Sequence, residues 1–185
     1  MNTSSVHKAL ARLTERLEAD AIPYAIVGGM ALNQHGYRRV TVAVDVLLTP
    51  DGLSRFKERH LGRGYLEQFP GSRGMRDTVE DVKIDVLLTG DFPGDGKPKP
   101  VAFANPTDVA TRGQDCMVVN LPTLVEMKLA SGLDLIHRLK DLADVVELIR
   151  AVDVPRELVE QLDPWVRDKF LELWDGAQSG LGDEY

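Results

Sequence analysis

This sequence of 185 residues has a single cysteine, no long apolar run and no histidine pair at metal-ligand spacing. Cys116 is the only cysteine, which excludes an intramolecular disulfide and a zinc site built from cysteines. The four histidines, at positions 7, 35, 60 and 137, show no i, i+4 spacing, so any metal must be held mainly by carboxylates. No segment approaches the roughly 18 to 20 apolar residues of a membrane span. Residues 1–17 lack an apolar signal core, which predicts a cytoplasmic protein without a membrane partner.

Acidic side chains outnumber basic ones, and the net charge is -7 at neutral pH. The excess is greatest at the end of the chain: residues 155–185 carry 8 acidic and 3 basic side chains, whereas residues 1–100 carry 13 and 14. A near-neutral front half with basic pairs such as Arg38-Arg39 is compatible with a phosphate-bearing ligand. Nothing resembles the broad basic face typical of nucleic-acid binding, so a nucleic acid is not the favoured partner.

Apolar periodicity and glycine or proline punctuation predict strands and helices in alternation, followed by helices alone. We expect strands at 24–27, 40–48, 65–69, 75–79, 82–88 and 116–119. We expect helices at 6–17, 30–35, 53–60, 123–129, 135–150 and 157–178, the last as one or two segments. The segment 90–100 is too rich in glycine and proline for either pattern and is expected to form a loop.

These elements predict an α+β fold: a small mixed sheet of four or five strands with flanking helices and a C-terminal helical bundle. The composition, with 43% hydrophobic and 28% charged residues, is that of an ordinary globular protein. We expect residues 1–120 to form an α/β core and residues 121–185 a helical region packed on it, as a single compact unit.

Two aspartates lie in strands that are otherwise apolar, Asp45 in the strand 40–48 and Asp85 in the strand 82–88. An ionised carboxylate buried alone is costly unless it is paired, hydrogen-bonded or bound to a metal. If the two strands are neighbours, both carboxylates converge and suit a hard cation such as Mg²⁺, which takes oxygen ligands. The alternative is that each aspartate lies at a strand edge, solvated or capping a turn.

The stretch IVGGMALNQHGYRRVTVAVDVLL, followed later by VKIDVLL, resembles the nucleotidyltransferase superfamily that shares its fold with DNA polymerase beta. The signature of that family is a strand, a Gly-Gly or Gly-Ser turn, a helix, a strand with Asp-x-Asp, and a third carboxylate on a later strand. Gly28-Gly29 matches the glycine turn, Asp45 the second aspartate and Asp85 the third carboxylate. Ala43 occupies the position of the first aspartate.

Further along, LPTLVEMKLASGLDLIHRLKDLADVVELI is similar to the helical region of the abortive-infection toxins, a subgroup of this superfamily. In that subgroup, a lysine on one helix is followed by an R-x-K-D-x-x-D run on the next. The matching residues are Lys128, Arg138, Lys140, Asp141 and Asp144.

The resemblance implies a sheet of the nucleotidyltransferase type and a metal-dependent enzyme whose substrate is a nucleoside triphosphate. In the family, the Asp-x-Asp pair and the third carboxylate hold two Mg²⁺ ions, which neutralise phosphate charge and activate the acceptor. Asp45 and Asp85 would be the metal ligands and catalytic carboxylates, in a site weakened by Ala43. Gly28 and Gly29 would let backbone amides approach the triphosphate.

The resemblance also assigns nucleotide-binding residues beyond the carboxylates. Lys128 would offer its charge to the β- and γ-phosphates, whereas its helix position alone favours a solvated lysine. Asp141 and Asp144 either take part in nucleotide binding or pair with basic residues of their own helix, Arg138 and Lys140. The basic pair that contains Arg39 either meets substrate phosphates or caps the entrance of a strand.

Ala43 has two explanations, a natural loss of one metal ligand or an engineered substitution, and both predict impaired chemistry. The favoured function is transfer of a nucleoside monophosphate to a hydroxyl or phosphate of tRNA, a protein or a small molecule. A toxin role, with an antitoxin partner, is one form of it. The alternative is a catalytically inactive nucleotide- or partner-binding regulatory module. The helix from Pro164 either packs on the core or forms a homodimer face.

Overall fold

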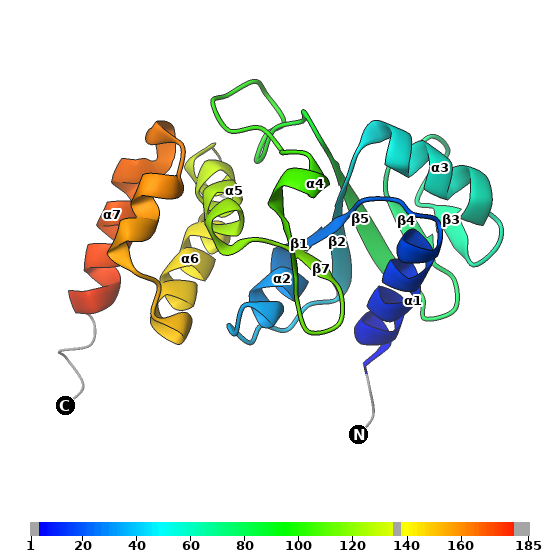
Figure 1. Cartoon of the computed structure of the whole chain (residues 1–185), viewed down its shortest axis with the longest axis horizontal. Coiled ribbons are helices and arrows are strands. Elements are labelled where there is room, and N and C mark those ends of the chain that lie inside the picture. Colours follow the sequence, from blue (N-terminus) through cyan, green and yellow to red (C-terminus); the bar gives the residue numbers. More distant parts are fainter. Residues whose placement is uncertain (1–3, 135–137, 180–185) are drawn as a thin grey trace.

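The computed structural model describes residues 4–134 and 138–179 (Figure 1). Its centre is a seven-stranded mixed sheet with the order β3-β4-β5-β2-β1-β7-β6. The strands are β1 (Ala25–Val27), β2 (Ala43–Leu48), β3 (Tyr65–Glu67), β4 (Met75–Asp77), β5 (Val82–Leu88), β6 (Ala110–Arg112) and β7 (Met117–Val119). β2 runs parallel to β5 and β1 runs parallel to β7, while the other neighbours are antiparallel. The predicted α+β class is correct, but the sheet has seven strands instead of the expected four or five.

Helices flank this sheet and continue after its last strand. They are α1 (Ser5–Ala19), α2 (Gly28–Gln34), α3 (Pro50–His60), α4 (Pro106–Val109), α5 (Leu121–Asp134), α6 (Leu139–Val152), the 3-10 helix η2 (Arg156–Gln161) and α7 (Pro164–Ser179). Caps that can be read from the sequence set several starts. At α3, for example, the Thr49 hydroxyl accepts a hydrogen bond from the Gly52 N–H at 3.0 Å, and Pro50 occupies the first turn.

Side chains of successive strand residues point to opposite faces of the sheet and enter two separate cores. On one face, Val44, Val46 and Ile84 pack in a core that includes residues of α1 and α3. On the other face, Val27 and Leu47 pack in a core formed largely by α5, α6 and α7. Figure 1 shows these three helices together at one end of the molecule, with α1 and α3 at the other. Asp45 and Asp85 lie on the face of the sheet that α5 adjoins.

Several expected boundaries differ from the structure. The strand expected at 40–48 begins only at Ala43, where pairing with β5 begins, and Val42 in the preceding segment is 80% exposed. The short elements α4 and β6 were not predicted, because each is only three or four residues long. The expected helix 157–178 is divided into η2 and α7, and the expected helix 135–150 begins at Leu139, while residues 135–137 lie outside the described residues.

The predicted hairpin between β4 and β5 is present, with antiparallel pairing of the two strands. Asp81 lies in its turn with φ of +57°. The expected boundary between a core and a helical region at residue 120 stays a prediction. α5 begins one residue after that boundary and shares a hydrophobic core with the sheet and with α6 and α7. Among the described residues, no helix is long and apolar enough to cross a membrane.

Candidate active site

Asp45 and Asp85 lie side by side on adjacent parallel strands, because β2 and β5 pair with these two residues in register. Both point away from the core that contains Val44 and Ile84. Burial, followed by the negative charge of Asp85, raises the pKa of Asp45. Asp85 is partly exposed and pairs with Lys83 Nζ at 2.8 Å. The structure therefore brings the two predicted carboxylates together and gives them different environments.

Gly28 lies against the Asp45 carboxylate, since β1 is antiparallel to β2 and Val27 stands opposite Asp45. Its φ is +61°, a conformation that other residues rarely adopt. A Cβ atom on Gly28 would lie 2.1 Å from Asp45 Oδ2, so no side chain fits there. A Cβ atom on Gly29 would lie 3.1 Å from Thr41 Cβ, which is tight but less restrictive. The absence of a side chain at Gly28 thus makes room for the half-buried carboxylate of Asp45 itself.

Ala43 lies two residues before Asp45 on β2 and therefore on the same face of the sheet. It stands opposite Lys83 in the parallel register. The Thr41 hydroxyl donates a hydrogen bond to the Ala43 carbonyl oxygen at 3.0 Å, which fixes the backbone at the start of the strand. An aspartate at this position would add a carboxylate next to that of Asp45 and opposite a lysine.

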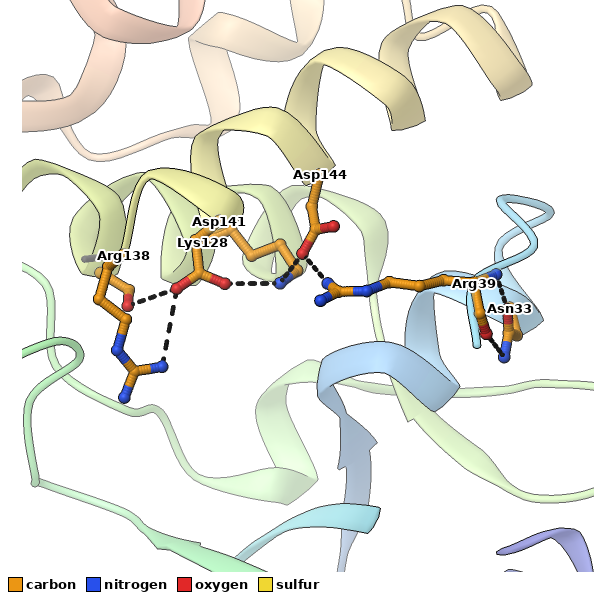
Figure 2. Close-up of polar contacts among 7 residues, drawn as sticks. Asn33, Arg39, Lys128, Arg138, Asp141 and Asp144 are labelled. Atoms are coloured by element: carbon orange, nitrogen blue, oxygen red, sulfur yellow. Dashed lines mark hydrogen bonds and ion pairs between the residues drawn. The ribbon is translucent and has the colours of Figure 1, made fainter. Parts of the chain in front are cut away.

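A cluster of charged side chains joins α5, α6 and the segment after α2 (Figure 2). Lys128 Nζ lies 2.7 Å from Asp144 Oδ2 and 3.0 Å from Asp141 Oδ1, and Lys128 is only 8% exposed. Arg39 also pairs with Asp144, and the Ser131 hydroxyl donates to Asp141 at 2.8 Å. Burial opposes ionisation of Asp141, but the charge and hydrogen bond of Lys128 outweigh this effect and lower the pKa of Asp141.

The cluster shows which ion pairs these residues form. Lys128 is a buried, doubly paired residue, so the expectation of a solvated lysine is wrong. Asp141 forms the expected helix pair with Arg138, at 3.8 Å. Asp144 is paired with Lys128 and Arg39 instead of with Lys140, which is exposed.

Arg39 reaches the cluster because Asn33 holds its backbone from both sides. The Asn33 side chain donates to the Arg39 carbonyl at 3.0 Å and accepts from the Arg39 N–H at 2.6 Å. Figure 2 shows the Arg39 side chain extending from this clamp towards Asp144 on α6. Arg39 therefore connects α2 to α6, which differs from the strand cap that the sequence also allowed.

One cavity of about 670 Å³, within the size range of small-molecule sites, joins these features. Every residue predicted for the site lines it except Asp144, which lies behind Lys128. The ionisable lining residues are the basic Arg39, Lys83, Lys128, Arg138 and Lys140 and the acidic Asp45, Asp85 and Asp141. The balance of five basic to three acidic side chains suits an anionic ligand beside a carboxylate pair.

Some contributors were not predicted from the sequence. Lys83 shares the face of Asp85, and strand alternation alone identifies that position. Ser131 follows Lys128 by three residues, so helical spacing places the two on one face. Asn33 and Gln68 act through tertiary hydrogen bonds, which no local pattern indicates; Gln68 donates to Asp85 Oδ1 at 3.4 Å.

The oxygen ligands available to a cation are the carboxylates of Asp45 and Asp85. Across residues 4–134 and 138–179, no group of three or more His, Cys, Asp or Glu side chains is placed to hold a metal ion. Two carboxylates fit the needs of one Mg²⁺ ion, which commonly takes one or two protein carboxylates and completes its shell with water and substrate phosphates.

Comparison with known proteins locates the fold. No protein-family model matches the sequence, and no curated protein sequence matches it. A crystal structure of ANT(2'')-Ia in complex with adenylyl-2''-tobramycin matches with a TM-score of 0.53 and 10% identity, covering 94% of this chain and 99% of that chain. A solution structure of the antibiotic-resistance factor ANT(2'')-Ia matches with a TM-score of 0.47 and 12% identity, covering 95% of this chain and 96% of that chain. The crystal structure of JHP933 from Helicobacter pylori matches with a TM-score of 0.33 and 16% identity, covering 91% of this chain and 90% of that chain. The chain therefore shares the α+β fold of ANT(2'')-Ia.

Proposed function

We propose that this protein is a metal-dependent nucleotidyltransferase that moves a nucleoside monophosphate from a nucleoside triphosphate to an acceptor. The observation that carries the proposal is the pairing of Asp45 with Asp85 on neighbouring strands, in a cavity that also contains the glycine turn and an excess of basic side chains. The likeness of fold to ANT(2'')-Ia, solved in complex with adenylyl-2''-tobramycin, supports a nucleotidyl-transfer reaction.

Asp45 and Asp85 are the residues that would hold Mg²⁺. The raised pKa of Asp45 fits this role, because a cation would offset the repulsion between the two carboxylates and the cost of burial. When bound, Mg²⁺ supplies Lewis-acid stabilisation of the triphosphate. With Ala43 the site has one carboxylate fewer than the family pattern, so we expect it to bind one Mg²⁺ ion instead of two.

The remaining residues bind and orient the triphosphate. Gly28 and Gly29 line the cavity without side chains of their own, so their backbone N–H groups would be open to approach by phosphate oxygens. Lys128 is already neutralised by Asp141 and Asp144, so it orders the wall of the cavity more than it contributes free charge. The exposed Lys140 and the 41%-exposed side chain of Arg138 retain charge for the outer phosphates. Asp85, the more exposed carboxylate, is suited to accept a proton from the acceptor.

The acceptor could be a small molecule, a tRNA or a protein, and the comparison with ANT(2'')-Ia sets the order in which to test them. ANT(2'')-Ia was solved with adenylyl-2''-tobramycin, so a hydroxyl of a small molecule is the first acceptor to test here. A tRNA end and a protein hydroxyl are the next two. A toxin role with an antitoxin partner, and a homodimer through α7, stay predictions. Growth arrest on expression of an active variant would support the toxin role.

The deciding experiment incubates the protein and its Ala43→Asp variant with Mg²⁺, each of four α-labelled nucleoside triphosphates, a cell extract and a panel of aminoglycosides. We expect label on an acceptor with the Ala43→Asp variant and much less with the unchanged protein. The matched control carries Asp45→Asn in addition to Ala43→Asp and is expected to be inactive. Removal of Mg²⁺ with EDTA is expected to abolish transfer.

Three outcomes are distinguishable. Label with both proteins would mean that Asp45 and Asp85 are sufficient for catalysis. Nucleotide binding by both proteins without any transfer would favour the regulatory module, whose function is binding alone. Absence of nucleotide binding by either protein would refute the proposal.

A further inference from the structure

Six apolar residues line the cavity and take no part in its ion pairs. They are Leu87 on β5, Leu124 and Met127 on α5, and Phe92, Pro93 and Phe103 from the chain after β5, and together they are called the apolar end here. None of these side chains carries a charge, whereas other lining residues, among them Asp45 and Lys128, carry charges of both signs. Leu87 follows Asp85 by two residues on the same face of β5, so the apolar end begins directly beside the carboxylate pair.

The loop 90–100 forms part of this end and is held by one buried lysine. Lys99 Nζ donates to the Pro93 carbonyl at 2.6 Å and to Asp95 Oδ1 at 2.9 Å, and it pairs with Asp134 at the end of α5. Its side chain is only 6% exposed. A backbone N–H within the loop and the Lys99 ammonium lower the pKa of Asp95 to about 2, so this partner is ionised at neutral pH.

The close approach of the loop to α5 is also built into its backbone. Gly94 has φ of +75°, and a Cβ atom there would lie 2.6 Å from Asp134 Oδ2. At the base of the loop, the Phe103 N–H donates to the Asp91 carbonyl at 2.8 Å. In Figure 1 the loop, in green, lies beside α5. Phe92 and Phe103 are therefore carried on a fixed backbone, despite the many glycine and proline residues between them.

We propose that this apolar end is the nucleobase subsite of the cavity and that Lys99 is the positioning residue that holds it in place; the inference rests on the proposed function. A nucleoside triphosphate has a polyanionic part and a planar, uncharged part, which match the charged and the apolar lining residues of the cavity. Aromatic side chains bind nucleobases by stacking on their faces. The exposed Lys83 side of the carboxylate pair is then left for the acceptor.

The test compares ATP with inorganic tripolyphosphate, which carries phosphates without a base, by titration calorimetry of the full chain with Mg²⁺. We expect the unchanged protein to bind ATP at least tenfold more tightly. Phe92→Ala is expected to weaken ATP binding about tenfold and to leave tripolyphosphate binding unchanged. Phe69→Ala is the matched control, because Phe69 is 65% exposed and does not line the cavity; it is expected to change neither.

Lys99→Met is expected to reproduce the pattern of Phe92→Ala, since the loop loses its attachment to α5. Lys99→Arg keeps the charge and is expected to recover part of the ATP affinity. Because Lys99→Met leaves Asp134 buried without its partner, the double variant with Asp134→Leu is measured as well. We expect weak ATP binding and unchanged tripolyphosphate binding in that variant too, which general unfolding would not produce.

The outcomes separate this inference from the proposed function. Equal affinity of the unchanged protein for ATP and tripolyphosphate, or an equal loss of both with Phe92→Ala, would overturn the subsite and leave the phosphate site standing. If Phe92→Ala raises the KM of the acceptor and spares ATP binding, the apolar end belongs to the acceptor and the inference is wrong. If neither ligand binds to the unchanged protein or to Ala43→Asp, the proposed function fails and the subsite fails with it.

Discussion

Lys128→Met tests whether the buried charge cluster stabilises the fold. Removing one partner of a buried ion pair typically costs 3–5 kcal/mol, because the other charge is left without compensation. Here Asp144 keeps Arg39, and Asp141 keeps Ser131 and a distant Arg138, so we expect the lower end, about 3 kcal/mol. This corresponds to a Tm lower by about 6–12 °C for a chain of this size. In urea, the midpoint should fall by roughly 1.5 M at an unchanged m-value.

The matched control is Lys140→Met, which removes a lysine from an exposed position on α6. A surface substitution of this kind is expected to change stability by less than about 0.5 kcal/mol. Both variants are measured by urea unfolding followed by circular dichroism. A loss below about 1 kcal/mol for Lys128→Met, similar to that of an exposed pair, would refute the view that these charges are buried and mutually dependent.

Three further predictions concern other parts of the molecule. Gly28→Ala should destabilise the protein by about 2 kcal/mol or more and abolish nucleotide binding, because the new Cβ atom meets Asp45. The control is Gly62→Ala, where φ is +73° and no atom lies near the new Cβ; it should cost only about 1–2 kcal/mol in urea unfolding. Asp45→Asn should stabilise the protein without Mg²⁺, since a raised carboxyl pKa in the folded state costs stability at neutral pH; the gain should shrink as the pH falls towards about 4. Cys116, buried and with its thiol pKa raised to about 11, should resist iodoacetamide at pH 8 until the chain unfolds, and rapid alkylation would contradict its burial.

The sequence predicted the long, periodic elements well, because their signals are local. β5 and α1 are amphipathic over several residues, so apolar spacing identifies them. The start of β2 was set too early, since Val40 and Val42 are apolar but have no strand beside them. Whether an apolar run pairs with a neighbour is a tertiary property. The short β6 was missed for the same reason, since its three residues are held by pairing with β7.

The candidate site was predictable where residue type alone is unusual. A carboxylate within an apolar strand is rare enough to mark Asp45 and Asp85 without a structure. The ion pairs of Lys128 were not predictable, because Lys128, Asp144 and Arg39 come together only through packing of α5, α6 and the segment after α2. The apolar end of the cavity was equally hidden, since Lys99 holds its loop through Asp134, which is distant in the sequence.

Ala43 connects stability with metal binding, and Ala43→Asp is expected to shift the balance between them. The new carboxylate would lie on the face of Asp45 and opposite Lys83, adding repulsion to a group whose pKa is already raised. Without divalent cations the variant should therefore be less stable than the unchanged protein. With Mg²⁺ this difference in stability should shrink or change sign, because a third oxygen ligand strengthens Mg²⁺ binding and ligand binding stabilises the folded state. Thermal unfolding at increasing Mg²⁺ concentrations measures both the loss of stability without Mg²⁺ and the gain with it. If the Tm of the variant rises no more steeply with Mg²⁺ than the Tm of the unchanged protein, position 43 is not part of a metal site.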